Sequence, residues 1–241
     1  LRSGLCSERP AGVRRLATAN PGQQSRRAMV TLRANFDERC CVLPGEQPWV
    51  LSPTPGVERM MLDRIGDEIA RATSVVRFAP NTVFPEHAHG GGEEFLVLQG
   101  LFVDEDGEYP VGAYVRNPVG SKHAPRAGRD GATLLVKLHQ FARGDRQRVV
   151  RQTATLPWLP GSVPGLSVMP LHEFGEEHTA LVRWAPNTRF HRHSHWGGEE
   201  ILVMEGVFRD EHGNYPAGSW LRNPHRSVHT PFTAAEGATI W

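Results

Sequence analysis

The stretch HAHGGGEEFLVLQG, residues 87–100, returns almost unchanged as HSHWGGEEILVMEG, residues 193–206. Both belong to a longer block, 77–134, which aligns with 183–240 at a constant offset of 106 residues and without a gap. Within this block, 31 of 58 positions are identical. The retained residues are mostly Gly, Pro, His and Glu, which shape turns and bind metals. The chain is therefore a tandem duplication, and both copies keep the same candidate metal ligands.

Length and composition agree with two all-β domains. A chain of 241 residues accommodates two domains of about 100 to 110 residues, and the duplication favours this division. There are 25 Gly and 19 Pro, and the segments between them are short and rich in β-branched and aromatic residues. This pattern predicts many short strands, tight turns and little helix. In the first copy we expect strands at 57–63, 73–79, 93–99, 101–103, 111–116 and 132–141, with a hairpin turn at DEDGEY.

Changes in composition predict the domain boundaries. Residues 1–42 are expected to be a basic extension without stable structure, because 1–33 hold seven Arg and one acid, Glu8. Met29 precedes the first structured-looking segment, so we interpret the residues before it as an upstream extension. The remaining segments are expected to be a first domain at 43–141, a charged linker at 142–157, and a second domain at 158–241 whose last strand is cut short.

Charge, hydropathy and cysteine content exclude several classes of protein. The formal net charge is +1 with acids and bases interspersed, so no nucleic-acid-binding face is expected. No apolar run approaches the roughly 20 residues that span a bilayer. The three cysteines, Cys6, Cys40 and Cys41, all precede the repeats and predict no disulfide framework. We therefore expect a cytoplasmic protein that binds neither membranes nor nucleic acids.

Four residues of the first copy form a candidate metal site. His87 and His89 alternate along an extended segment, so both imidazoles point to the same side. The turn-forming GGG then brings Glu93 back toward them, and His123 follows a hairpin later. Three imidazoles and one carboxylate suit a divalent transition metal and leave one or two positions open for water or substrate. The second copy offers the same set in the same register: His193, His195, Glu199 and His229.

The residues beside these candidate ligands leave some alternatives open. Glu94 and Glu200 follow the candidate ligands directly, so on a strand they should point outward into salt bridges. Arg116 and Arg222 either bind an anionic substrate inside the barrel or point outward and pair with those acids. In the second copy, His191, Trp196 and His225 replace Pro85, Gly90 and Val119 near the metal. This exchange makes the first site the more open one.

The conserved motifs resemble those of the cupin family. HxHxxxE followed by Gly100 resembles the first cupin motif, and the stretch from Gly112 to His123, ending PxGxxH, resembles the second. The other copy repeats both, with Arg226 in place of the second motif's Gly. The sequence of these motifs is similar in particular to that of the ChrR-like cupin family, named after a zinc anti-sigma factor. The resemblance implies two tandem RmlC-like jelly-roll barrels, each holding a metal through His, His, Glu and His.

The resemblance suggests two functions. One is a metal-binding double cupin in stress-linked or metal-linked regulation. The other is a non-haem metal-dependent dioxygenase that cleaves a diketone or hydroxy-ketone. Zn or Fe is the expected metal, with Mn, Ni and Cu as alternatives, and the sequence assigns no catalytic residue beyond the metal ligands. We also expect a homodimer and a small-molecule ligand in the barrel. A sigma-factor partner is not expected, because residues 1–48 contain no His and no CxxC pair.

Overall fold

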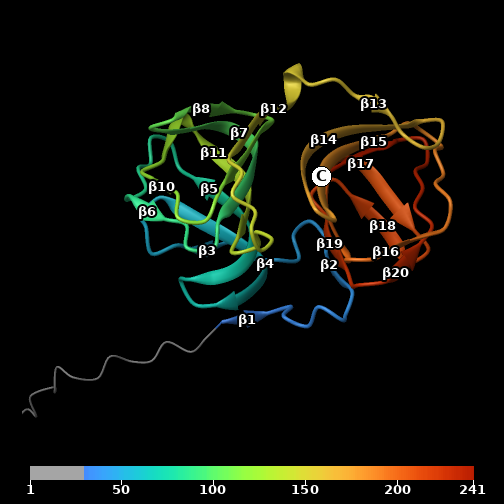
Figure 1. Cartoon of the computed structure of the whole chain (residues 1–241), viewed down its shortest axis with the longest axis horizontal. Helices are drawn as coiled ribbons and strands as arrows, with labels where there is room; N and C mark the ends of the chain where they lie inside the picture. The colour runs from blue at the N-terminus through green and yellow to red at the C-terminus, as the bar shows by residue number, and fades with distance from the viewer. Residues whose placement is uncertain (1–29) are drawn as a thin grey trace, which may run out of the picture.

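The computed structural model describes residues 30–241 and shows two β-barrels side by side (Figure 1). Every strand pairing is antiparallel. The larger sheet of the first barrel has the order β1 (Thr31–Leu32), β4 (Val57–Gly66), β5 (Ala70–Phe78), β11 (Arg126–Leu138), β7 (Glu93–Asp104), β9 (Ala113–Asn117) and β12 (Val149–Gln152). Strand β3 (Val50–Leu51) pairs with β4, and β8 (Gly107–Pro110) pairs with β7. A small second sheet joins β6 (His87–Ala88) to β10 (Lys122–His123).

The second barrel repeats this plan. Its larger sheet has the order β13 (Leu159–Pro160), β14 (Leu166–Phe174), β15 (Glu177–Trp184), β21 (Ala238–Ile240), β17 (Glu199–Asp210), β19 (Trp220–Asn223) and β2 (Cys40–Val42). Strand β18 (Gly213–Pro216) pairs with β17, and β16 (His193–His195) pairs with β20 (Ser227–His229). Within the described residues, the helical content is the 3-10 turn η1 (Thr153–Thr155).

The two repeats exchange one short strand each, β2 and β12. Strand β2 precedes the first barrel in the sequence, yet it pairs with β19 of the second barrel, with Cys41 opposite Leu221. Strand β12 precedes the second barrel and pairs with β9 of the first, with Val150 opposite Val115. Figure 1 shows both crossings, with blue β2 beside β19 and β12 beside the first barrel. Each exchanged strand covers a sheet edge that would otherwise present unpaired N–H and C=O groups.

Two expectations about boundaries therefore need correction. The range 142–157, predicted to be a linker, contains strand β12 and the turn η1. The predicted unstructured extension, 1–42, contains β1 and β2 near its end, while its part up to residue 29 lies outside the described residues. Strands β2 and β12 have only three and four residues, which is too short to show an alternating pattern, and each pairs at the edge of the other barrel's sheet.

Apolar residues form three buried clusters rather than two. One fills each barrel: Phe95, Val97 and Phe102 belong to the first, and Ile201, Val203 and Phe208 to the second. The third lies between the barrels and joins Leu96 and Tyr114 to Leu171 and Trp220, among others. Strand β7 is therefore buried on both faces, which explains why FLVL is a continuous apolar run instead of an alternating one. Truncating Leu96, which is fully buried, should cost about 2 to 5 kcal/mol.

Strand β7 merges two segments that were predicted separately, 93–99 and 101–103. The bend between them lies at Gly100, whose φ is +73°. A Cβ there would collide with the carbonyl oxygen of Gly131, and Gly206 faces the carbonyl of Gly237 in the same way. The predicted hairpin follows, with Asp104 paired to Gly107. The Gly of the first motif is thus required for close backbone approach.

Candidate metal centres

The small sheet at the mouth of each barrel brings the predicted ligands together. In the first barrel, His87 on β6 lies directly opposite His123 on β10. His89 follows β6, and Glu93 begins β7. In the second barrel, His193 on β16 lies opposite His229 on β20. The chain from β7 to β10 therefore folds back and places the distant histidine beside the HxH segment. The spacing in the sequence alone could not specify this placement.

The first site holds four donor atoms close together. One donor atom from each of His87, His89, Glu93 and His123 lies within 4.8 Å of the others. The nearest Glu93 oxygen is 3.4 Å from Nε2 of His89 and 3.6 Å from Nε2 of His123. The three imidazole centroids are separated by 4.7 to 4.9 Å. Such spacing leaves room at the centre for one ion in contact with all four groups.

Hydrogen bonds orient the histidines toward that centre. Nδ1 of His87 lies 2.9 Å from the carbonyl oxygen of Pro85, and Nδ1 of His123 lies 3.1 Å from the Asp104 carboxylate. Both partners accept hydrogen bonds, so each imidazole carries its proton on Nδ1 and presents the Nε2 lone pair. Asp104 is itself held by the Tyr109 hydroxyl at 2.9 Å.

The burial of the donors fits a metal ion. Nε2 of His89 and Nε2 of His123 are both buried and have no hydrogen-bond partner. Buried nitrogens without a partner are costly, whereas coordination of a cation would satisfy them. Glu93 is buried as well, and its only side-chain hydrogen bond comes from Asn117 Nδ2 at 3.1 Å. The four residues therefore match the needs of a divalent metal.

The electrostatics point the same way. Burial lowers the pKa of His89 to about 4, so this imidazole is neutral near pH 7. Burial raises the pKa of the Glu93 carboxyl, which an adjacent cation would reverse. Burial acts on His123 too, but Asp104 and Glu93 outweigh it and raise the pKa of His123 above its ordinary value. The site thus combines a neutral imidazole with a buried carboxyl group, and an adjacent cation would stabilise the ionised form of that carboxyl group.

The second site has the same residues in a looser arrangement. Donor atoms of His193, His195 and His229 lie within 4.8 Å of one another. Glu199 completes the set with oxygens 3.3 Å from Nε2 of His195 and 3.7 Å from Nε2 of His229. Those two Nε2 atoms are only 2.9 Å apart, so one proton must be shared between them in the metal-free chain. Burial lowers the pKa of His195 to about 4 and raises that of Glu199.

Arginines on the exchanged segments support both sites from outside. Arg39, beside β2, donates to Asp210 at 2.8 Å, to the Tyr215 hydroxyl at 2.6 Å and to Asn223 at 2.8 Å. Asp210 lies 3.5 Å from Nδ1 of His229, and Asn223 donates to Glu199 at 2.8 Å. Burial raises the pKa of Asp210, but hydrogen bonds from His229 and Tyr215, together with the charge of Arg39, outweigh it and lower the pKa to about 2.

The first barrel has a weaker version of this support. Arg148, beside β12, contacts the Tyr109 hydroxyl at 3.2 Å and Asp106 at 2.7 Å. It does not bond directly to Asp104 or Asn117, the groups that hold His123 and Glu93. The motif spacing did not predict these supporting residues, although Asp, Asn and Tyr recur at the same offset as the ligands, and Arg39 matches Arg148.

A cavity of about 310 Å³ opens onto the first site. The four candidate ligands form part of its wall, and apolar side chains such as Phe84 and Leu138 form much of the rest. His139, which follows β11 with φ +56°, also lines it and packs against Gly91. The candidate metal in the first barrel is therefore accessible to a small molecule.

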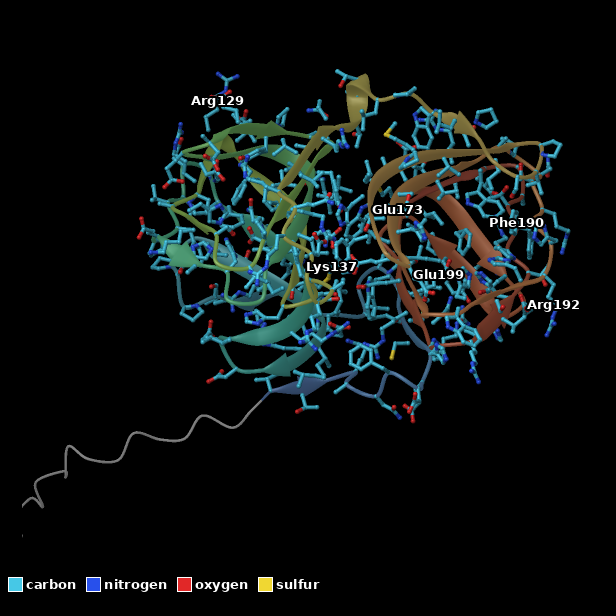
Figure 2. All side chains as sticks on the ribbon, in the orientation of Figure 1. Arg129, Lys137, Glu173, Phe190, Arg192 and Glu199 are labelled. Carbon is cyan, nitrogen blue, oxygen red and sulfur yellow. The ribbon has the colours of Figure 1, made fainter. Side chains whose placement is uncertain are left out.

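The residues next to the ligands resolve the open alternatives. Glu94 points away from the site, where Tyr114 donates to it and Arg116 lies 3.2 Å away. Glu200 likewise points toward the other barrel and pairs with Lys137 at 2.8 Å. Lys137 lies between the two barrels (Figure 2). The outward prediction for both glutamates is confirmed.

Arg116 and Arg222, the first residues of the repeated Arg-Asn-Pro sequence, also point outward. Arg116 contacts Asp145 at 2.7 Å and Glu177 of the second barrel at 3.0 Å. Arg222 pairs with Asp63 of the first barrel at 2.7 Å instead of with Glu200. Both arginines therefore join the barrels, as in the outward alternative, and neither lines the cavity at the first site. In the second copy, Trp196 is exposed at the surface and lies against His225 and Arg226.

Comparisons with known proteins agree with this geometry. A comparison with curated protein sequences gives no significant match. In the described residues, no helix is long and apolar enough to cross a membrane. Among solved structures, a candidate dioxygenase from Nostoc punctiforme is similar with a TM-score of 0.71 and 14% identity, over 88% of this chain and 85% of that one.

Two further structures show the same fold. Protein Ylba from E. coli matches with a TM-score of 0.65 and 11% identity, over 89% of this chain and 93% of that one. Oxalate decarboxylase from Lactobacillus farciminis matches with a TM-score of 0.59 and 11% identity, over 83% and 84%. The predicted all-β tandem cupin fold is confirmed. The ChrR cupin-like domain model matches residues 37–142 and again 146–241, so the chain belongs to this cupin family and contains the domain twice.

Proposed function

We propose that the chain is a metal-binding double cupin that holds one divalent transition metal in each barrel. The ligands are His87, His89, Glu93 and His123 in the first barrel; the second uses His193, His195, Glu199 and His229. The observation that supports this most strongly is the pair of buried, unpartnered Nε2 atoms beside Glu93, within 4.8 Å of a third imidazole. Zn or Fe suits three imidazoles and a carboxylate, and Mn, Ni or Cu can also be held by such a set.

The first metal is the one that binds a small molecule. Its ligands form the wall of the 310 Å³ cavity, so a ligand that enters the barrel reaches the metal's open side. A bound metal would act as a Lewis acid on an oxygen of that molecule. The chain's own residues prepare the site: Asp104 fixes the proton of His123 on Nδ1, and Asn117 holds the Glu93 carboxylate.

A second candidate function is catalysis on the bound molecule. The cavity at the first site favours it, and one structural neighbour is a candidate dioxygenase. An oxygen-dependent cleavage of a diketone or hydroxy-ketone would use the same metal and cavity. Metal-linked or stress-linked regulation, which the resemblance to ChrR-like cupins implies, uses the same sites without turnover.

Elemental analysis of the full chain, purified without added metal, tests the proposal. We expect two metal ions per chain when metal is available in the growth medium. At most one metal for two chains would contradict it. Oxygen uptake by the iron-loaded protein with a diketone would favour the enzyme, and tightly held zinc without turnover would favour the regulator.

A further inference from the structure

A buried arginine lines the cavity of the first barrel together with the candidate metal ligands. Arg64 lies near the end of β4 and is only 4% exposed. It forms the cavity wall with Arg59, Glu68 and the metal-ligand quartet. Arg64 lies outside the repeated motifs, in the hairpin of β4 and β5, so the sequence did not predict this role.

A β-bulge turns Arg64 into the barrel. Met61 pairs with Ser74 and Asp63 pairs with Thr73, so Leu62 is an extra residue on β4. Alternation then places Asp63 on the outer face, where it binds Arg222 of the other barrel. Arg64 pairs with Ala72 and faces inward, because Ala72 and Ser74 both line the cavity. Without the bulge, an aspartate would face the cavity instead.

The guanidinium of Arg64 has no carboxylate partner in the described part of the chain. Its hydrogen bond goes to the backbone carbonyl of Asp67. The neighbouring Glu68 is paired with Arg59 at 3.2 Å. Burial and the charge of Arg59 lower the pKa of the Arg64 guanidinium, and the charges of Glu68 and Asp67 offset this only in part. A buried cation in this state would be stabilised by an anion that enters the cavity.

The second barrel lacks this feature. Position 173 corresponds to Arg64, since both residues follow the same bulge in the first hairpin. It is occupied by Glu173, whose charge is opposite and whose side chain is 74% exposed. Figure 2 shows Glu173 on the second barrel. The duplication therefore retained both candidate metal quartets, while the matched position after the bulge holds a buried cation in the first copy and an exposed carboxylate in the second.

We propose that the first barrel binds a small organic acid whose carboxylate pairs with Arg64 while a second oxygen of the same molecule faces the metal site. This inference rests on the proposed function, because the second oxygen needs the metal. Arginine recognises a carboxylate through two parallel hydrogen bonds. The apolar wall between, which includes Val76, Phe78 and Phe102, suits a short hydrocarbon or aromatic body.

Calorimetric titration of the metal-loaded full chain tests this inference. The probes are 4-oxopentanoate and phenylpyruvate, each compared with its methyl ester, which keeps the shape and removes the charge. We expect at least one acid to bind, and to bind about tenfold or more tightly than its ester. Equal affinity of acid and ester, or no binding of either acid at millimolar concentration, would overturn the inference.

Variants locate the charge that is recognised. Arg64→Gln should remove the preference for the acid, and Arg64→Lys should retain part of it because the charge remains. Arg129→Gln is the matched control, since Arg129 is 90% exposed on the outside of the same barrel (Figure 2). Glu173→Gln is the control for the second barrel. Neither control should change the affinity.

Metal content separates this inference from the proposed function. Two metals per chain in Arg64→Gln, with the preference for the acid lost, would support both. Two metals with the preference unchanged would overturn the role of Arg64 and leave the metal sites intact. Absence of metal from the unaltered chain would overturn the proposed function itself. Circular dichroism of Arg64→Gln and Arg64→Lys confirms that each variant is folded before it is titrated.

Discussion

The two barrels carry the same four candidate ligands in different surroundings. In the first, the side chains of His89 and Glu93 are 3% and 10% exposed; in the second, those of His195 and Glu199 are 22% and 19% exposed. The first site opens onto a cavity that contains a buried arginine, while exposed Trp196 lies in the metal-binding loop of the second. Duplication thus preserved the candidate metal quartet and altered the residues around it.

Removal of one histidine from either site should have the largest effect on this comparison. We expect His89→Ala and His195→Ala each to lower the metal content from two ions per chain to one, because each quartet belongs to a single barrel. Elemental analysis of both variants measures this directly. Loss of both metals from either variant would show that the two sites are not independent.

Replacement of the carboxylate ligand should separate the sites by function. Glu93→Gln removes the negative charge from a buried quartet, so binding of a small molecule and any turnover in the first barrel should be lost. Glu199→Gln should mainly lower the metal-dependent rise in melting temperature. Calorimetry and differential scanning fluorimetry of both variants test this. Full ligand binding by Glu93→Gln would place the chemistry in the second barrel.

The two outward glutamates should differ in their contribution to stability. Glu200→Gln removes the salt-bridge partner of half-buried Lys137, whose side chain is 19% exposed, and should cost about 3 kcal/mol of unfolding free energy, the low end for breaking a buried pair. Glu94→Gln should cost less, about 1 to 3 kcal/mol, since Arg116 keeps Asp145 and Glu177. Urea denaturation of the metal-loaded proteins measures both. An equal loss in the two variants would contradict the difference.

The salt bridge between Glu200 and Lys137 predicts opposite pH dependences of stability for the unaltered chain and for Glu200→Gln. In the unaltered chain, Glu200 outweighs burial and raises the pKa of Lys137 above 10.5, so its stabilisation is lost only as pH rises through that higher value. In Glu200→Gln, the charges of Glu94 and Glu177 still raise the pKa of Lys137, but the largest raising contribution is gone, so we expect burial to prevail and hold the folded-state pKa below 10.5. The unfolded state then binds more protons between the two values, so stability should increase with pH there. Denaturation at about pH 7 and about pH 10 tests the sign.

The supporting arginines should give the smallest effect. Arg39→Ala removes three hydrogen bonds that hold Asp210, Tyr215 and Asn223, and should weaken metal binding in the second barrel by about tenfold to a hundredfold. Arg148→Ala should weaken the first site less, because Arg148 reaches only Tyr109 and Asp106. Competition with a chelator measures both affinities. A larger effect of Arg148→Ala would reverse the ranking.

The repeated motifs predicted the tandem cupin fold, because His, Glu and Gly at fixed spacing are constrained by local geometry. The residues of each predicted quartet lie close together, and their role as metal ligands stays a prediction. What escaped prediction depends on distant parts of the chain. The strands CCV and VVRQ are too short to show a period, and their partners lie in the other barrel. Arg64 faces the cavity only because a bulge shifts the alternation of β4. The expected homodimer and cytoplasmic location stay predictions; sedimentation would test the former.

The exchange of first strands also bears on how such a chain arose. Each repeat has a vacancy beside its own β9 or β19 that the first strand of the other repeat fills. Two identical single-repeat polypeptides would complement each other by the same reciprocal step, so the present chain corresponds to a strand-swapped dimer whose genes have fused. Fusion replaces a bimolecular encounter by an internal one and raises the effective concentration of the partner. After proteolytic cleavage between residues 142 and 146, the two fragments should accordingly remain associated through the exchanged strands.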